Sequence, residues 1–559
     1  MTSKQVITLQ FGHFSNFVGT HIWNIQEAYF SSSHVSQDSD VDHNVLFRSV
    51  QTKHGDSYEP RLVLFDLQGS FGALKRGGEL RETRATVDTW SGQVETYEHD
   101  PYPQNPFLQY QTSLGESSSD PSTLSTPFTP QSLNQLPIQP SSPPPPTFSD
   151  VLDASVHVWS DFSKLVYHPK SIAQLSMYSH ENDISPFALF GQGRDVWKNR
   201  DFREDIIDDR IRFFLEDSDS LQGFQILTNT NDGFGGLASC VMDAILDDMP
   251  KASLMTYGIS EARDPIVDNV KDYKTRMWEN VNQMMCLKYL KDASSVYIPV
   301  CSPLPSELDP NGWSKHLRPK FHLPYHTSAY LASLIETASL LFRIYTTPLY
   351  IQDVASLISS SNYTKIAAMS GAVPVHQIQD ETTMRLVLQY NPRAGHKFPW
   401  IRDSTLRVGY DQVDHENGQY AVLRGIGSHL PPEARSRIPA VSKQQEALDE
   451  FCASFPTPAG GCLGYVMNQG LPISDAFPQM FNSGDTISTT ESALVRIHTP
   501  SRIKNLLQSA ILQIDTLPPS VMRPLERVVD SQDGGLSLDE LKDIKEDFQE
   551  TAAVYNEIC

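Results

Sequence analysis

Hydrophobic and polar positions in the first 345 residues form short apolar runs and longer periodic segments that follow one another in turn. Apolar runs rich in β-branched residues predict buried strands, and apolar positions recurring every three or four residues predict amphipathic helices. The predicted strands comprise residues 6–11, 61–69, 223–228, 252–258 and 294–300. The predicted helices comprise residues 16–30, 203–219, 236–249 and 270–290. This alternation predicts an α/β fold, a Rossmann-like domain whose parallel sheet has helices on both faces.

A long amphipathic segment separates this domain from a second one with a different pattern. Residues 327–345 predict one long core helix. Beyond it, strand patterns at 385–391, 419–427 and 492–498 predict a mixed α+β domain. The chain then predicts an acidic helix over residues 537–558.

Residues 102–147 differ in composition from the segments on either side. This tract is rich in proline, serine and threonine. Such a composition buries too little apolar surface to offset the entropy of ordering the chain. We therefore predict a disordered insertion, because strand and helix patterns continue on both sides of it.

Composition narrows the class of protein without identifying it. The chain has 559 residues, and its 44 basic against 67 acidic residues give a net charge of −23, which argues against nucleic acid or an anionic membrane as the main partner. Its six cysteines form no CxxC pair, which argues against a disulfide framework and a zinc site. No apolar run is long enough to predict a membrane-spanning helix. The N-terminal residues lack the features of a secretory signal or a presequence, and we expect them to begin the first strand.

The segment 221–239 carries the clearest sign of chemistry. Its predicted strand runs into a glycine-rich turn and then into a helix, an arrangement that holds phosphate on backbone N–H groups and a helix N-terminus. Asp232 lies inside this turn, where its carboxylate would repel a phosphate by about 4 kcal/mol at 4 Å and an effective dielectric near 20. The alternative for Gly233, Gly235 and Gly236 is a tight turn with close packing of helix on sheet.

Several segments, in their order along the chain, resemble the tubulin superfamily. They comprise residues 7–24, 60–70, 190–193, 208–225, 337–343, 421–428 and 492–511. The resemblance implies a tubulin-like fold with a Rossmann-like N-terminal domain, a long core helix, an α+β intermediate domain and a C-terminal helical hairpin. The implied boundaries are 1–101 and 148–325 for the nucleotide domain, 102–147 for the insertion, 326–346 for the core helix, 347–500 for the intermediate domain and 501–559 for the C-terminal helices.

Four stretches resemble one branch of that superfamily, the Misato family. They are LQFGHFSNFVGTHIWN at 9–24, VWSDF at 158–162, HPKS at 168–171 and DGFGGLA at 232–238. This resemblance implies a tubulin-like protein with a role in mitochondrial distribution and network morphology.

The resemblance also implies where a nucleotide pocket would lie. The residues of this expected pocket are Gly12, His13, Asn16, Asp66, Gly233, Gly235 and Gly236. In the glycine turn, Asn231 and Asp232 stand where tubulin has two glycines. The pocket is therefore expected to keep the backbone of a phosphate loop and to lose part of its chemistry.

Further substitutions support a degenerate pocket. His13 replaces a glutamine that reaches the phosphates and metal in tubulin, and Gln68 replaces a glutamate that helps to hold Mg²⁺. A neutral amide lacks the charge that this hard cation prefers. Cys301 and Ser302 stand where tubulin recognises the base. In the loop that would complete a neighbouring subunit's GTPase site, Asp353 is the one candidate acid.

We therefore expect a protein that is not an enzyme, with no catalytic residues, no metal and no bound cofactor. It would support mitochondrial distribution, morphology and fusion or network maintenance through partner binding. The implied location is the cytoplasm and, peripherally, the mitochondrial outer membrane. The implied partners are proteins of that surface, tubulin or the cytosolic chaperonin, with the acidic C-terminal helix as the candidate interaction surface.

Two alternatives stay open. The first is an active polymerising GTPase of the tubulin type, which would bind GTP and turn it over. The second is a cytoskeletal factor for tubulin assembly, which would co-purify with tubulin or the chaperonin.

Overall fold

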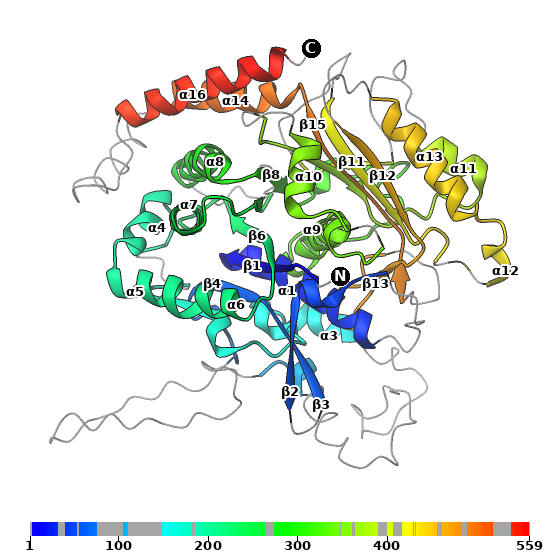
Figure 1. The fold of residues 1–559 in the computed structure, drawn as a ribbon, viewed down its shortest axis with the longest axis horizontal. Helices are drawn as coiled ribbons and strands as arrows, with labels where there is room; N and C mark the ends of the chain where they lie inside the picture. The colour runs from blue at the N-terminus through cyan, green and yellow to red at the C-terminus, as the bar shows by residue number, and fades with distance from the viewer. Residues whose placement is uncertain are drawn as a thin grey trace.

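Two sheets pack on a central helix in the computed structural model (Figure 1). The structure describes residues 3–31, 40–52, 55–74, 104–109, 148–180, 185–262, 273–346, 348–359, 364–388, 400–405, 416–428, 430, 432–455, 461–481, 489–517 and 538–557.

The first sheet has six parallel strands in the order β5-β4-β1-β6-β7-β8. Their bounds are β1 Gln5–Phe11, β4 Leu62–Gln68, β5 Ile172–Ser179, β6 Leu221–Asn229, β7 Leu254–Ser260 and β8 Val296–Cys301. This order is that of a Rossmann fold, so the predicted α/β class is confirmed. The direction of winding reverses between β1 and β6, and loops that follow strands at such a switch point form the usual ligand crevice.

Helices cover both faces of this sheet because side chains alternate along each strand. On β4, Leu62 and Leu64 belong to the core on one face, and Val63 and Phe65 belong to the core on the other. The first core includes α1 and α9, and the second includes α4, α7 and α8. The helices of this domain are α1 His13–Ser31, α3 Phe148–Ser155, α4 Phe190–Trp197, α5 Arg200–Glu204, α6 Arg212–Glu216, α7 Phe234–Asp248 and α8 Tyr273–Ala293, with a π-helical turn at Asp205–Ile211. A hairpin of β2 (Phe47–Thr52) and β3 (Gly55–Pro60) projects from this domain (Figure 1).

The second sheet is mixed and has the order β10-β9-β15-β11-β12. Its strands are β9 Ala368–Ala372, β10 Arg402–Asp403, β11 Glu416–Arg424, β12 Cys462–Met467 and β15 Ala493–Pro500. Helices α11 (Glu381–Leu388) and α13 (Val441–Ala453) lie on its outer side (Figure 1). The remaining elements are α10 Ile351–Ile358, α12 Pro432–Arg435, β13 Leu471–Pro472 and β14 Thr490–Glu491.

The chain ends in a helical hairpin of α14 (Ile503–Asp515) and α16 (Leu538–Glu557). Residues Leu541, Ile544 and Phe548 of α16 are buried against the first domain, as their spacing along the helix requires. Within the part of the chain that the structure describes, no helix is long and apolar enough to cross a membrane.

The strand predicted over residues 385–391 is wrong, because its described part lies in helix α11. Met384, Val387 and Leu388 are buried on one side of this helix. Asp380 caps it by accepting a hydrogen bond from the backbone N–H of Thr383 at 2.8 Å. This cap lies before the apolar run, so the run alone indicated a strand.

The described part of the tract predicted to be disordered is also ordered. Residues 106–109 form a helical turn, and Phe107 is buried in the main core. The side chain of Asn105 donates to the hydroxyl of Ser155 at 2.9 Å and so ties this turn to the end of α3. Of the tract 102–147, the structure describes residues 104–109, and the rest lies outside the described part of the chain.

The core helix α9 spans Pro324–Ala338 and continues as a 3-10 turn over Ser339–Phe342. The predicted helix is therefore present, with an α-helical part that ends earlier than expected. The guanidinium of Arg343 explains this end, because it donates to the carbonyl oxygens of Glu336 at 2.9 Å and Ser339 at 3.3 Å. These carbonyls would otherwise accept the next bonds of the helix.

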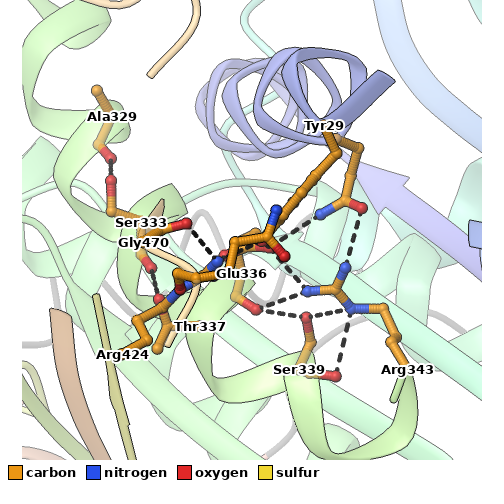
Figure 2. Close-up of polar contacts among 11 residues, drawn as sticks. Tyr29, Ala329, Ser333, Glu336, Thr337, Ser339, Arg343, Arg424 and Gly470 are labelled. Carbon is orange, nitrogen blue, oxygen red and sulfur yellow. Dashed lines mark hydrogen bonds and ion pairs between the residues drawn. The ribbon is translucent and has the colours of Figure 1, made fainter. Parts of the chain in front are cut away.

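A buried ionic network around Glu336 on α9 joins helix α1 to strand β11 of the second sheet (Figure 2). Glu336 Oε1 accepts from Arg343 Nη2 at 2.9 Å, and Oε2 accepts from Arg424 Nη1 at 2.8 Å. The three charged side chains are 0–1% exposed. Although burial opposes ionisation, Arg424 and Arg343 hold the pKa of Glu336 below its ordinary value.

Neutral groups complete the network. Helix α1 contributes Tyr29 and Gln26, which donate to Glu336 Oε1 at 3.0 and 3.1 Å. Gln26 Oε1 accepts from Arg343 at 2.9 Å, and the carbonyl oxygen of Gly470 accepts from Arg424 at 2.8 Å. Every charge therefore has hydrogen-bond partners, as burial demands.

Replacing Glu336 by glutamine should destabilise the protein severely, because both arginines would remain buried without their counter-charge. We expect a loss of about 3–5 kcal/mol in the free energy of unfolding, the usual cost of removing one partner of a buried ion pair. Denaturant unfolding followed by circular dichroism measures it. The control is Glu381→Gln on α11, where a half-exposed carboxylate contacts Lys443 at 2.7 Å. Equal losses in the two variants would contradict the importance of the Glu336 network.

Candidate nucleotide site

The predicted site residues come together where the loops after β1, β4 and β6 meet at the switch point of the first sheet. Gly12 follows β1 with φ +99°, a conformation that favours glycine. A Cβ atom at this position would lie 2.6 Å from Asn229 Nδ2 and 2.9 Å from the ring of Phe234. The first loop therefore packs directly on the end of β6 and the start of α7.

Asp66 at the end of β4 is fully buried and surrounded by hydrogen-bond donors. Its Oδ2 accepts from Trp159 Nε1 at 2.8 Å and Asn16 Nδ2 at 3.0 Å, and lies 3.3 Å from His13 Nδ1. Its Oδ1 accepts from the backbone N–H of Leu67 at 2.8 Å. Although burial opposes ionisation, His13, Asn16 and this N–H hold the pKa of Asp66 below its ordinary value. The acid that would serve a magnesium site is thus engaged by the protein itself.

His13 and Gln68 lie at the outer part of this site. The His13 side chain is 22% exposed, and its ring lies 4.1 Å from the ring of His180 at the end of β5. Gln68 is exposed, and its backbone carbonyl accepts from the N–H of His180 at 2.9 Å.

Asp232 lies at the N-terminus of α7, and each of its carboxylate oxygens accepts one hydrogen bond. Its Oδ1 accepts from the backbone N–H of Phe234 at 2.9 Å, and its Oδ2 accepts from Asn229 Nδ2 at 2.8 Å. Asn229 Oδ1 in turn accepts from the backbone N–H of Ser15 in the first turn of α1 at 2.8 Å. One carboxylate, with one amide, therefore occupies the positive ends of the two helices that flank the switch point.

Asn231 is also bound within the turn. Its Oδ1 accepts from Ser260 Oγ at 3.0 Å and Gln283 Nε2 at 2.9 Å. Its backbone carbonyl accepts from Asn282 Nδ2 at 2.8 Å. These bonds fix the turn to the end of β7 and to helix α8.

The three glycines of the turn allow helices to pack closely. A Cβ on Gly233 would lie 2.8 Å from the ring of Phe187, and one on Gly235 would lie 2.2 Å from Cys286 Sγ. A Cβ on Gly236 would lie 1.9 Å from the carbonyl oxygen of Phe190 in α4. Gly235 and Gly236 thus allow α7 to pack closely on α8 and α4, and Gly233 allows close contact with the segment before α4.

The remaining predicted positions have structural partners as well. Cys301 and Ser302 are buried, and their carbonyl oxygens each accept from the guanidinium of Arg402 at 3.0 Å. Arg402 is itself paired with Glu307. Asp353 caps α10 by accepting from the backbone N–H of Tyr350 at 2.9 Å.

Two residues that shape this site were not expected from the sequence. Asn229 connects the two helix ends, and Trp159 binds Asp66 from a 3-10 turn over Trp159–Phe162. The motif VWSDF drew attention to Trp159, but the bond crosses the tract that separates the two parts of the domain. Among the described residues, no group of three or more histidine, cysteine, aspartate or glutamate side chains could hold a metal ion.

Comparison with protein families matches two models to this domain. Residues 4–114 match the Misato Segment II tubulin-like domain, and residues 149–344 match the Tubulin domain. The first match continues past residue 101, the boundary predicted for the first part of the domain. The two matches include every residue of the glycine turn and of the loops around Gly12 and Asp66.

Individual proteins match over most of the chain. Protein misato homolog 1 of Homo sapiens is 28% identical, and the match covers 86% of this chain and 84% of that protein. Protein misato homolog 1 of Bos taurus is 26% identical over 99% of this chain and 98% of its own length. Protein DML1 of Gibberella zeae is 32% identical over 61% of each chain.

The burial of Asp232 gives the stability of the protein a defined dependence on pH. Burial raises the pKa of Asp232 to about 6, against 3.8 for the free group. The folded state therefore binds the proton more tightly than the unfolded state, and the contribution of Asp232 to stability falls as pH rises from about 4 to about 6. The free energy of unfolding, measured for the native protein and for Asp232→Ala across this range, should differ by an amount that declines with pH by on the order of 1 kcal/mol.

The control for this measurement is Asp247→Ala, which removes one exposed carboxylate from the same helix. It separates the loss of one negative charge from the loss of the bonds to Asn229 and Phe234. A difference between the native protein and Asp232→Ala that rises with pH would mean that Asp232 is held in its charged form.

Proposed function

Because the chain belongs to the Misato family of tubulin-like proteins, we propose that it acts without catalysis, as a tubulin fold that binds partner proteins. The family implies a role in mitochondrial distribution, morphology and network maintenance. In this proposal the side chains at the switch point have a structural role. Asp232 and Asn229 connect α1 with α7, and the glycine turn packs α7 on α4.

The observation that carries this proposal is the internal ligand at the switch point. Asp232 and Asn229 already satisfy the backbone N–H groups of Phe234 and Ser15. A nucleotide phosphate would have to displace the carboxylate from the N-terminus of α7 and would meet a second anion, Asp66, in the same site. Repulsion between like charges makes this exchange unfavourable.

The residues present do not fit a nucleotide with its magnesium ion. Mg²⁺ requires octahedral oxygen ligands, of which one or two are carboxylates. Asp66 accepts from Trp159, Asn16 and a backbone N–H, and Gln68 is exposed beside it. We infer that the protein functions without GTP, and its action then depends on its surface.

The outer side of α16 is the surface that we propose for partner binding. Asp543, Glu546 and Glu550 recur every three or four residues and are exposed, so they form an acidic stripe. Opposite them, the apolar side of α16 packs on α14 and the first domain. Asp547 anchors the helix through Lys291 at 2.7 Å and Lys288 at 2.9 Å on α8. A stripe of this kind on a firmly held helix suits a basic partner surface.

We propose that this partner lies on the cytoplasmic face of the mitochondrial outer membrane, so that attachment is peripheral. The overall charge of −23 supports a protein partner over an anionic lipid surface. The attachment is therefore expected to depend on ionic strength.

The first test of the proposal is GTP binding and hydrolysis by the purified protein. With Mg²⁺ present, we expect no binding in equilibrium dialysis and no release of phosphate above that in buffer, with tubulin assayed in parallel as the positive control. Magnesium-dependent turnover that disappears in Asp66→Ala would instead establish the polymerising GTPase. The Asp232→Gly variant shows whether the internal carboxylate is the obstacle, because its removal should increase nucleotide affinity.

The second test concerns location and the acidic stripe. The native protein should sediment with isolated mitochondria, be digested by added protease while the outer membrane is intact, and be released by high salt. Reversal of charge at Glu546 and Glu550 to lysine should lower the bound fraction several-fold, and the matched reversal of the exposed Asp247 and Asp248 on α7 should not.

Proximity labelling with the same variants identifies the partner. Loss of labelled outer-membrane proteins in the Glu546 and Glu550 variant alone would support the proposed surface. Labelling dominated by tubulin or the chaperonin would favour the tubulin-assembly factor instead.

A further inference from the structure

Two cysteines lie together at the outer edge of the second sheet, far from the switch point. Cys452 is buried near the end of α13, and Cys462 is exposed at the start of β12. Cys452 Sγ lies 3.9 Å from the carbonyl oxygen of Leu463, the residue that follows Cys462, so the two cysteines are neighbours across α13 and β12. The close packing of α13 on β12 holds both residues in place.

Gln419 and Arg496 complete the surroundings of this pair. Gln419 on β11 lies opposite Cys462 in the sheet, and its Nε2 donates to the carbonyl oxygen of Cys452 at 2.7 Å. Gln419 Oε1 accepts from Arg496 Nε at 2.8 Å, which brings a buried guanidinium to the same side of the strand. Arg496 also lies 3.6 Å above the ring of Phe455 and pairs with Glu416.

These neighbours favour a thiolate at Cys462. The hydrogen bond from Cys452 and the charge of Arg496 lower the pKa of the Cys462 thiol, and the same bond and burial raise the pKa of Cys452. An exposed thiol with a lowered pKa, beside a second cysteine, has the features of a reactive, oxidisable cysteine.

We propose that Cys462 and Cys452 form a peroxide-reactive thiol pair that closes to a disulfide between β12 and α13. The Cys462 thiolate attacks one oxygen of a hydroperoxide, the O–O bond breaks, and the leaving oxygen takes a proton to become an alcohol or, from hydrogen peroxide, water. The resulting Cys462 sulfenic acid is attacked by the Cys452 sulfur, which loses its proton while the sulfenic hydroxyl leaves as water. The two thiols are oxidised by two electrons in all, and the peroxide is reduced by two.

The disulfide would connect an edge strand of the second sheet covalently to the helix beside it. Strand β12 is the last strand in the order of the second sheet, and α13 lies on its outer side. Joining the two would fix the start of this edge strand to the helix. This inference stands on the cysteine pair alone and does not depend on the proposed partner surface or on the absence of nucleotide.

The test is differential alkylation of the purified full-length protein before and after treatment with hydrogen peroxide. In the reduced protein, iodoacetamide at neutral pH should modify Cys462 at least ~10-fold faster than Cys240, which is partly exposed but whose pKa is raised to about 11 by burial. After peroxide, peptide mass spectrometry should find Cys452 linked to Cys462, with loss of both alkylation sites.

Three variants make the result specific. Cys462→Ala should abolish the linked peptide, Cys452→Ala should leave a sulfenic acid at Cys462 that dimedone traps, and the control Cys240→Ala should behave like the native protein. Two results would overturn the proposal. One is a linked peptide that pairs Cys462 with a cysteine other than Cys452. The other is a Cys462 that iodoacetamide still modifies after peroxide treatment as fast as before. Should Cys452→Ala fail to fold, the linked peptide in the native protein decides by itself.

Discussion

The pairing of Glu336 with two arginines is the interaction on which the arrangement of the two domains depends. Glu336 belongs to the core helix, Arg424 to the second sheet, and Tyr29 and Gln26 to the helix that follows the first strand. A buried carboxylate is stable only if it is paired and hydrogen-bonded, so each domain supplies what the other requires. The same atoms set where the α-helical part of α9 ends, because Arg343 takes the carbonyl oxygens at that point.

The carboxylates at the switch point likewise depend on hydrogen-bond partners from elsewhere in the chain. Asp66 and Asp232 are negative groups in a confined site, and each is satisfied by donors from other segments of the chain. At Asp66 and at Asp232, polar groups that a Rossmann-like fold would leave free for a ligand are hydrogen-bonded within the chain.

The sequence predicts the parts of this structure that depend on local pattern and fails where distant side chains decide. Strands β1, β4 and β6 to β8 have apolar runs that require burial, and the glycine turn marks the start of α7. The apolar run of helix α11 predicts a strand instead, because the cap at Asp380 lies outside the run. The partners of Glu336 are 88 and 307 positions away in Arg424 and Tyr29, and no spacing rule connects them. The position of Asn229 between two helices likewise needs the sheet order to be known.

The carboxylate of Asp232 is a tethered ligand of the α7 N-terminus. A group tethered two residues from the N–H that it binds is present at that N–H at an effective concentration far above that of any free anion in a cell. In a protein that functions without GTP, as proposed above, a change in the cellular supply of GTP leaves this equilibrium almost unaltered. Such a protein would present the same surfaces around α1 and α7 whether nucleotide is abundant or scarce.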